Sequence, residues 1–83
     1  MYKIAFDQEA KKEFLKIEKK SQELITNKIL DLQKGNFSTD KALKGKYKGK
    51  YRKRAGNYRI IYLKENDILL ITLIRIAHRK EAY

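Results

Sequence analysis

The stretch YRKRAGNYRIIYL, residues 51–63, decides the fold of this chain. Two runs with aromatic and β-branched residues, 51–54 and 58–63, flank the tripeptide Ala55–Gly56–Asn57. Glycine and asparagine tolerate positive φ, so this tripeptide is typical of a hairpin turn. We therefore predict two antiparallel strands joined as a β-hairpin.

Two more strands are predicted outside the hairpin. Residues 65–67, Glu-Asn-Asp, indicate a turn, and residues 68–77 are apolar on both faces over most of their length. Such a run indicates a central or well-covered strand. Near the start of the chain, Tyr2, Ile4 and Phe6 recur at the period of a half-buried strand.

Two helices are predicted between the first strand and the hairpin. Asp7 can cap a helix over residues 8–20, and Ser21 can cap a second one that ends at Gly35. Apolar residues recur at helical spacing in both segments: Ala10, Phe14 and Ile17, then Leu24, Ile25, Ile29 and Leu32. The short link between the segments implies an antiparallel helical hairpin.

These elements predict an α+β fold of order β-α-α-β-β-β, with the helical hairpin packed on a mainly antiparallel sheet. A chain of 83 residues has room for one domain, 1–83. The absence of cysteine excludes disulfides and thiolate metal sites, and with one histidine we expect neither a metal nor a cofactor.

The sequence also bears on location. The longest apolar stretch, residues 68–74, is well short of the roughly 20 residues needed to span a bilayer. Residues 1–6 are too short and too polar for a secretory signal. We therefore expect a soluble, cytoplasmic protein with no membrane partner.

Positive charge is concentrated in the second half of the chain. The net charge is +11; residues 1–40 carry eight Lys against seven acids, whereas residues 41–83 carry thirteen Lys or Arg against three. Residues 41–64 hold ten cations, no acid and four tyrosines, a mixture that suits phosphates and stacked bases. The alternative is a set of solvated lysines that protects a sheet edge. The unequal distribution favours a nucleic-acid surface.

Three arginines of the hairpin are candidates for phosphate chemistry. Arg52 and Arg54 leave the same face of a strand about 7 Å apart along the chain, where their guanidinium groups can grip one or two phosphates. Arg59 lies on an otherwise apolar row of the neighbouring strand. It either covers the core with its stem or clamps a phosphate, and the nearby arginines favour the clamp.

The last residues provide three further candidates. His78, the only histidine, follows the last strand and precedes Arg79. Histidine is the side chain that exchanges protons most readily near neutral pH. Tyr83 either stacks on a base or donates a proton, or it is a frayed terminus.

The order and spacing of these motifs resemble the RelE branch of the RelE/ParE toxin superfamily, across the whole chain. The similar segments are Leu43–Gly45, Tyr51–Arg54, Gly56–Tyr62 and Ile76–Arg79, with Tyr83. The resemblance implies a microbial type II toxin that cleaves messenger RNA in the ribosomal A site, beside ribosomal RNA, and is neutralised by a cognate antitoxin. The residues to which it assigns catalysis are Arg52, Arg54, Arg59, His78, Arg79 and Tyr83. The lysines expected to bind RNA are Lys44, Lys46, Lys48, Lys50 and Lys53.

Three positions depart from the family pattern. Family members often have lysine, as a general base, where this chain has Arg52 and Arg54; arginine keeps its proton, so Arg54 is expected to stabilise charge instead. A related branch uses a glutamate at the place held here by Lys41, next to Asp40. The sequence leaves the acid and the base unassigned among His78, Tyr83 and Lys53.

The mechanism predicted from these residues needs no metal. The 2′-hydroxyl of RNA attacks the adjacent phosphorus, the 5′-oxygen leaves, and the arginines stabilise the charge that grows on the phosphoryl oxygens. Two other functions stay open. One is a ParE-like toxin that inhibits DNA gyrase without catalysis, and the other is a basic RNA-binding module without activity.

Overall fold

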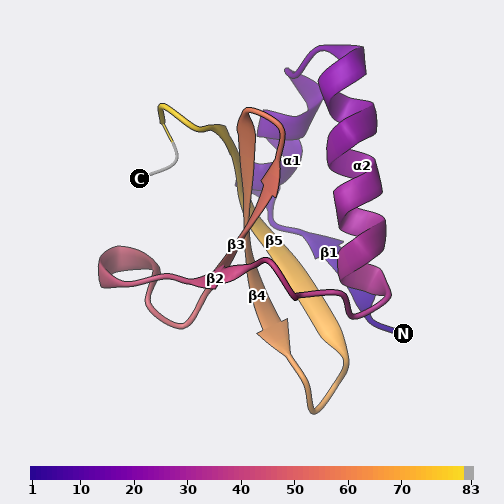
Figure 1. The fold of residues 1–83 in the computed structure, drawn as a ribbon, viewed down its shortest axis with the longest axis vertical. Helices are drawn as coiled ribbons and strands as arrows, with labels where there is room; N and C mark the ends of the chain where they lie inside the picture. The colour runs from indigo at the N-terminus through magenta and orange to yellow at the C-terminus, as the bar shows by residue number, and fades with distance from the viewer. Residues whose placement is uncertain (82–83) are drawn as a thin grey trace.

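The computed structural model describes residues 1–81 and forms two layers, with both helices on one face of a five-stranded sheet (Figure 1). The elements are β1 Lys3–Phe6, α1 Gln8–Leu15, α2 Lys19–Gln33, β2 Lys41–Ala42, the 3₁₀ turn η1 Gly45–Tyr47, β3 Tyr51–Ala55, β4 Tyr58–Glu65 and β5 Leu70–His78. The strand order is β1-β5-β4-β3-β2, with β1 parallel to β5 and the other neighbours antiparallel. The predicted α+β fold with a mainly antiparallel sheet is confirmed.

The core lies between the helices and the sheet. Ile25 and Leu32 of α2 are fully buried against Ile60 and Tyr62 of β4 and Leu73 of β5. The prediction of a central last strand is confirmed, because β5 runs between β1 and β4.

Two of the three predicted helix caps are confirmed. The Asp7 side chain accepts a hydrogen bond from the backbone N–H of Gln8. Gly35 has φ +84° and ends α2 with the backbone bonds of a Schellman motif, from Gly35 to Leu32 and from Asn36 to Asp31.

Other boundaries differ from the predictions. α1 ends at Leu15, before Lys20, and Ser21 lies inside α2, where its hydroxyl donates to Glu18; the prediction of a Ser21 cap is wrong, because the helix begins one residue after Glu18. β5 begins at Leu70, two residues later than expected, since the preceding turn contains Leu69 at φ +50°.

The segment between α2 and β3 holds structure that the sequence did not indicate. β2 is a two-residue strand, and η1 follows it within a lysine-rich and glycine-rich loop. Among residues 1–81, no helix is both long enough and apolar enough to cross a membrane.

Candidate nucleic-acid interface

The side chains of β3 alternate between the two faces of the sheet. Lys53 and Ala55 are buried on the side of the helices, whereas Arg54 is exposed and Arg52 half-buried on the opposite side. This alternation follows from the strand period of two. The two arginines thus leave one face together, as the spacing predicts.

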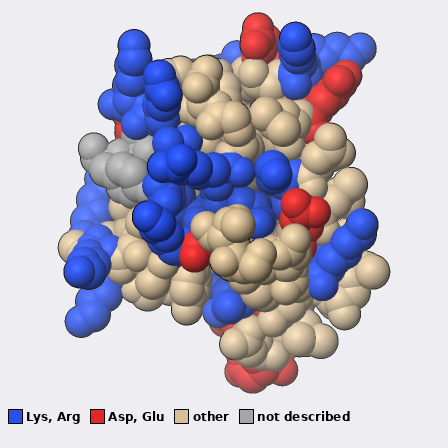
Figure 2. All heavy atoms as spheres, in the orientation of Figure 1, with Lys and Arg blue, Asp and Glu red and all other residues tan. Residues whose placement is uncertain are grey.

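Strand register extends this row of cations across the sheet. Lys41 of β2 lies opposite Arg52, Arg59 of β4 lies opposite Arg54, and Arg75 of β5 lies opposite Ile61, which is itself opposite Arg52. Directly opposite residues of antiparallel strands share a face. We call this set the cationic face: Lys41, Arg52, Arg54, Arg59 and Arg75. Figure 2 shows Lys and Arg side chains gathered over the middle of the view, where β3 runs in Figure 1.

One end of the cationic face is hollowed. Thr39, Lys41, Arg52 and Arg54 line a pocket of about 280 Å³. Within residues 1–81, neither of these two arginines forms an ion pair, and the buried Nε of Arg52 has no hydrogen-bond acceptor. Three cations converging on one pocket without a carboxylate suit an anionic ligand.

Arg59 is held beside Arg54 by the hairpin turn. Its side chain is 9% exposed, and Nη1 donates to the carbonyl oxygens of Tyr58 at 3.2 Å and Gly56 at 3.4 Å. Like charges directly opposite each other destabilise a sheet. The Arg54–Arg59 pairing places two cations next to each other on the cationic face.

Arg75 is a candidate that the sequence reasoning missed. The Glu13 carboxylate of α1 accepts from Arg75 Nε at 3.1 Å and Nη2 at 2.5 Å, and it also accepts from the backbone N–H of Ile76 at 2.8 Å. Hydrogen bonds to Glu13 and then to Tyr47 raise the pKa of Arg75. An arginine inside an otherwise apolar strand was the signal that could have drawn attention to it.

His78 lies apart from the cationic face. It is opposite Tyr58, on the side of the helices, and the two rings meet edge to face with centroids 5.5 Å apart. Its Nδ1 accepts from the backbone N–H of Lys80 at 3.3 Å. The exposed Arg79 is tied to the β3–β4 turn, because its N–H donates to the backbone carbonyl of Asn57 at 2.7 Å. Tyr83 lies outside the described residues.

The lysines expected to bind RNA have unequal surroundings. Lys44, Lys46 and Lys48 are exposed around η1, and Lys50 is half-buried. Lys53 is 4% exposed, and its Nζ forms an ion pair with Asp40 Oδ1 at 2.9 Å. Lys53 therefore faces the interior while its neighbours on the strand face outward, and we do not place it on the cationic face.

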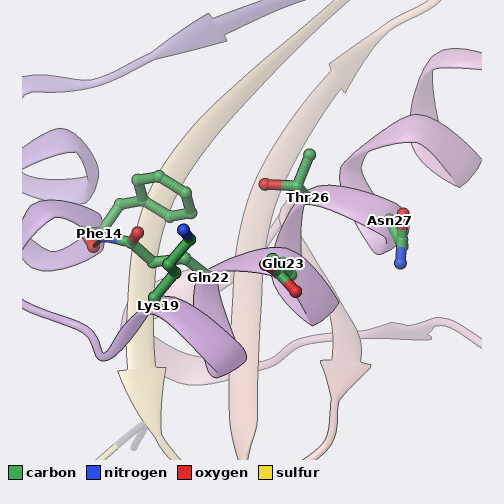
Figure 3. Close-up of a pocket in the computed structure, with 6 residues that line it drawn as sticks. All are labelled: Phe14, Lys19, Gln22, Glu23, Thr26 and Asn27. Carbon is green, nitrogen blue, oxygen red and sulfur yellow. Dashed lines mark hydrogen bonds between the residues drawn. The ribbon is translucent and has the colours of Figure 1, made fainter.

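A larger pocket, of about 440 Å³, lies at the helices rather than at the cationic face (Figure 3). Its lining mixes one cation, one acid, a hydroxyl and two amides with a phenyl ring: Phe14, Lys19, Gln22, Glu23, Thr26 and Asn27. The Gln22 amide already donates to the Phe14 carbonyl at 2.8 Å. This lining lacks the convergent cations of the smaller pocket, so we base the candidate site on the latter.

Comparisons with known proteins agree on the class. The fold is similar to that of the isolated E. coli RelE toxin (TM-score 0.79, 20% identity, 94% of this chain and 84% of that one). It is also similar to a YoeB/ParE toxin from Agrobacterium tumefaciens (0.79, 16%, 92% and 96%) and to a chain of the toxin-antitoxin complex RelBE2 from Mycobacterium tuberculosis (0.70, 22%, 94% and 98%). At these identities the likeness establishes the fold.

The sequence itself establishes the family. The profile described as ParE toxin of type II toxin-antitoxin system, parDE, matches residues 4–83. The chain therefore belongs to this toxin family, within the RelE/ParE superfamily. No protein with curated annotation matches the sequence. The profile carries the name ParE while these structural relatives include RelE and YoeB toxins, so the activity has to be argued from the residues.

Proposed function

We propose that this toxin is a metal-independent endoribonuclease that cleaves messenger RNA on the ribosome. The observation that carries the proposal is the cationic face. Arg52 and Arg54 line its pocket and have no acidic partner among residues 1–81, and Arg59 lies opposite Arg54 on the adjacent strand. Preorganised donors aimed at developing charge are the largest catalytic term in many enzymes.

The arginines act as charge stabilisers in this proposal. The 2′-hydroxyl attacks the adjacent phosphorus, the bond to the 5′-oxygen breaks, and a 2′,3′-cyclic phosphate and a free 5′-hydroxyl result. Arg52, Arg54 and Arg59 bind the phosphoryl oxygens, and Arg79 approaches from the tail that is tied to the hairpin turn. DNA lacks the attacking hydroxyl, so the proposal restricts the substrate to RNA.

The proton has to move through another group, because arginine does not lose its proton in proteins. Asp40 is unsuited, since one carboxylate oxygen is bound by Lys53 and the other by the Tyr62 hydroxyl. His78 is the candidate base or acid, with Tyr83 as its alternative. The ring of His78 has to turn away from Tyr58, or the RNA has to pass the end of the sheet, for His78 to reach the substrate.

The partners follow from the same proposal. The exposed Lys44, Lys46 and Lys48 are expected to contact ribosomal RNA in the cytoplasm, next to messenger RNA in the A site. A cognate antitoxin protein is expected to neutralise the toxin. The structures of RelBE2 and of E. coli RelBE, which are toxin-antitoxin complexes, support this expectation.

The test combines two assays on the same protein. Incubation with translating ribosomes in the presence of a chelator, followed by mapping of 5′ ends, should show cuts at codon positions. A gyrase supercoiling assay should show no inhibition. Arg59→Ala, Arg79→Ala and His78→Ala should each slow cleavage, by about 100-fold for an arginine that stabilises the transition state. Parental cleavage by all three variants, or inhibition of gyrase without RNA cuts, contradicts the proposal.

A further inference from the structure

Two short segments, residues 39–41 and 52–54, meet at the pocket of the cationic face. In each segment the two outer residues face the pocket and the middle residue faces the helices. Thr39 and Lys41 line the pocket from one segment, and Arg52 and Arg54 line it from the other. The middle residues of the two segments, Asp40 and Lys53, form an ion pair with N···O at 2.9 Å. The pair thus joins the two walls of the pocket from behind.

This ion pair is buried, and the Asp40 carboxylate also accepts a hydrogen bond from Tyr62. The side chains of Lys53 and Asp40 are 4% and 2% exposed, and the Tyr62 hydroxyl donates to the second carboxylate oxygen. Tyr62 is fully buried and stacks on Tyr51 with centroids 5.7 Å apart. Burial and the hydrogen bond to Asp40 raise the pKa of Tyr62, so its hydroxyl remains a donor.

The backbone pairing between the two walls is short. β2 contributes the pairs Lys41–Arg52 and Ala42–Tyr51, one more hydrogen bond runs from the Leu43 N–H to the Lys50 carbonyl at 2.9 Å, and the chain then enters the loop around η1. A slip of one residue between β2 and β3 would turn Lys41 to the other face of the sheet. The ion pair opposes such a slip, because Asp40 has to stay opposite the inward-facing Lys53.

Stability alone is a weak reason for a pair of this kind. Replacing a buried ion pair by apolar residues of similar size is often neutral or stabilising, while buried pairs can fix a register. In this chain, the register that the pair fixes is the one that forms the pocket.

We propose that Asp40 and Lys53 are positioning residues that hold Thr39 and Lys41 against Arg52 and Arg54, at the separation at which the pocket binds an RNA phosphate group. Thr39 and Lys41 are then ligands of that phosphate. This inference deepens the proposed function. It rests on that function only where RNA cleavage is measured, because the binding measurement uses an RNA that cannot be cut.

The experiment uses a charge-balanced double variant. Asp40→Leu with Lys53→Met removes the pair, keeps the net charge at +11 and leaves the long-range attraction to RNA unchanged. The probe is a single-stranded RNA whose 2′-hydroxyls are methylated, so that it binds without being cut. Binding is followed through the Nε–Hε NMR signals of Arg52 and Arg54. The matched control, Lys19→Gln with Glu23→Gln, removes two opposite charges from the exposed surface of α2.

We expect the double variant to unfold at a denaturant concentration equal to or above that of the parent. Its affinity for the probe should fall about tenfold or more, the loss expected for one charge-assisted hydrogen bond, while the control keeps the parental affinity. In the cleavage assay KM should rise more than kcat falls. Tyr62→Phe, which removes only the hydroxyl that donates to Asp40, should weaken binding by a smaller factor.

Parental affinity in the double variant overturns the proposal, as does RNA binding by the parent that leaves the signals of Arg52 and Arg54 unchanged. If the double variant does not fold, Tyr62→Phe decides, and parental affinity in that variant overturns the proposal too. A parent that binds the probe but cuts no RNA contradicts the proposed function and leaves this comparison of affinities intact.

Discussion

Lys53 and its neighbours Arg52 and Arg54 are consecutive cations on one strand with opposite surroundings. Lys53 faces the core, where Asp40 neutralises it at 2.9 Å. The two arginines face away from the helices and form no ion pair within residues 1–81. A basic run in a sequence is therefore not the same as a basic surface, because half of the charges on a strand can serve the interior.

The ion pairs Asp40–Lys53 and Glu13–Arg75, both within residues 1–81, differ in the same way. Asp40–Lys53 is almost inaccessible, while the side chains of Glu13 and Arg75 are 20% and 27% exposed. The first joins the walls of the pocket, and the second joins α1 to the part of β5 that lies beyond its pairing with β1. Removal of one partner of the buried pair should lower the free energy of unfolding strongly, because the other charge stays buried. Removal of one partner of the partly exposed pair should lower it less.

The largest expected effect on stability concerns the difference between the inward-facing and outward-facing cations of β3. Lys53→Ala leaves the Asp40 carboxylate buried without its ion-pair partner and should lower the free energy of unfolding by about 3–5 kcal/mol. Arg54→Ala, one position further on, should change it by about 0.5 kcal/mol or less. Urea unfolding monitored by circular dichroism measures both. Equal losses in the two variants contradict the inward and outward assignment.

The next effect concerns the turn that joins β3 to β4. Gly56 has φ +62°, and a Cβ there would lie 2.7 Å from Leu24 Cδ2 of α2. Gly56→Ala should cost about 2 kcal/mol, from backbone strain and the displaced leucine.

Gly49→Ala is the matched control for that variant. Gly49 has φ +88°, but a Cβ would meet nothing within 4 Å, so only strain of about 1 kcal/mol is expected. Thermal unfolding distinguishes the two. A larger loss for Gly49→Ala would mean that the contact with α2 does not constrain the turn.

A smaller effect sharpens the comparison of the ion pairs. Glu13→Ala removes the acceptor for both Arg75 and the Ile76 N–H, and should cost about 1–2 kcal/mol. Glu13→Gln keeps a carbonyl oxygen for Ile76 and should cost less than about 1 kcal/mol, because the ion pair is partly exposed. Chemical denaturation of both variants tests this order, and a glutamine variant as unstable as the alanine variant contradicts it.

The smallest effect on stability is expected at η1. Lys46→Ala and Lys48→Ala should change the free energy of unfolding by about 0.5 kcal/mol or less, since both side chains are exposed. Each should lower the slope of log K for RNA binding against log salt by about 0.7, the value for one phosphate contact on a single strand. An unchanged slope in both variants removes these lysines from the RNA-binding surface.

The sequence predicted the elements wherever local chemistry decides them. Asp7 caps a helix because its side chain accepts a backbone hydrogen bond, and Gly35 ends one because glycine adopts positive φ without strain. Ser21 does not act as a cap, because the helix already begins at Lys19 and Ser21 lies inside its first turn. β2 and η1 were missed, since neither has a hydrophobic period to reveal it.

The sequence by itself determined the order of the two helices and of the strands β1, β3, β4 and β5, the family, and the placement of Arg52 and Arg54 on one face, because each depends on local periodicity or on ordered motifs. Only the tertiary structure decided that Lys53 is sealed behind the pocket, that Arg75 joins the cationic face and that His78 lies on the other side. These outcomes depend on strand register and on Asp40 and Glu13, which are distant in the chain. Charge pairs across such distances form only when the sheet brings them together, so no local pattern encodes them.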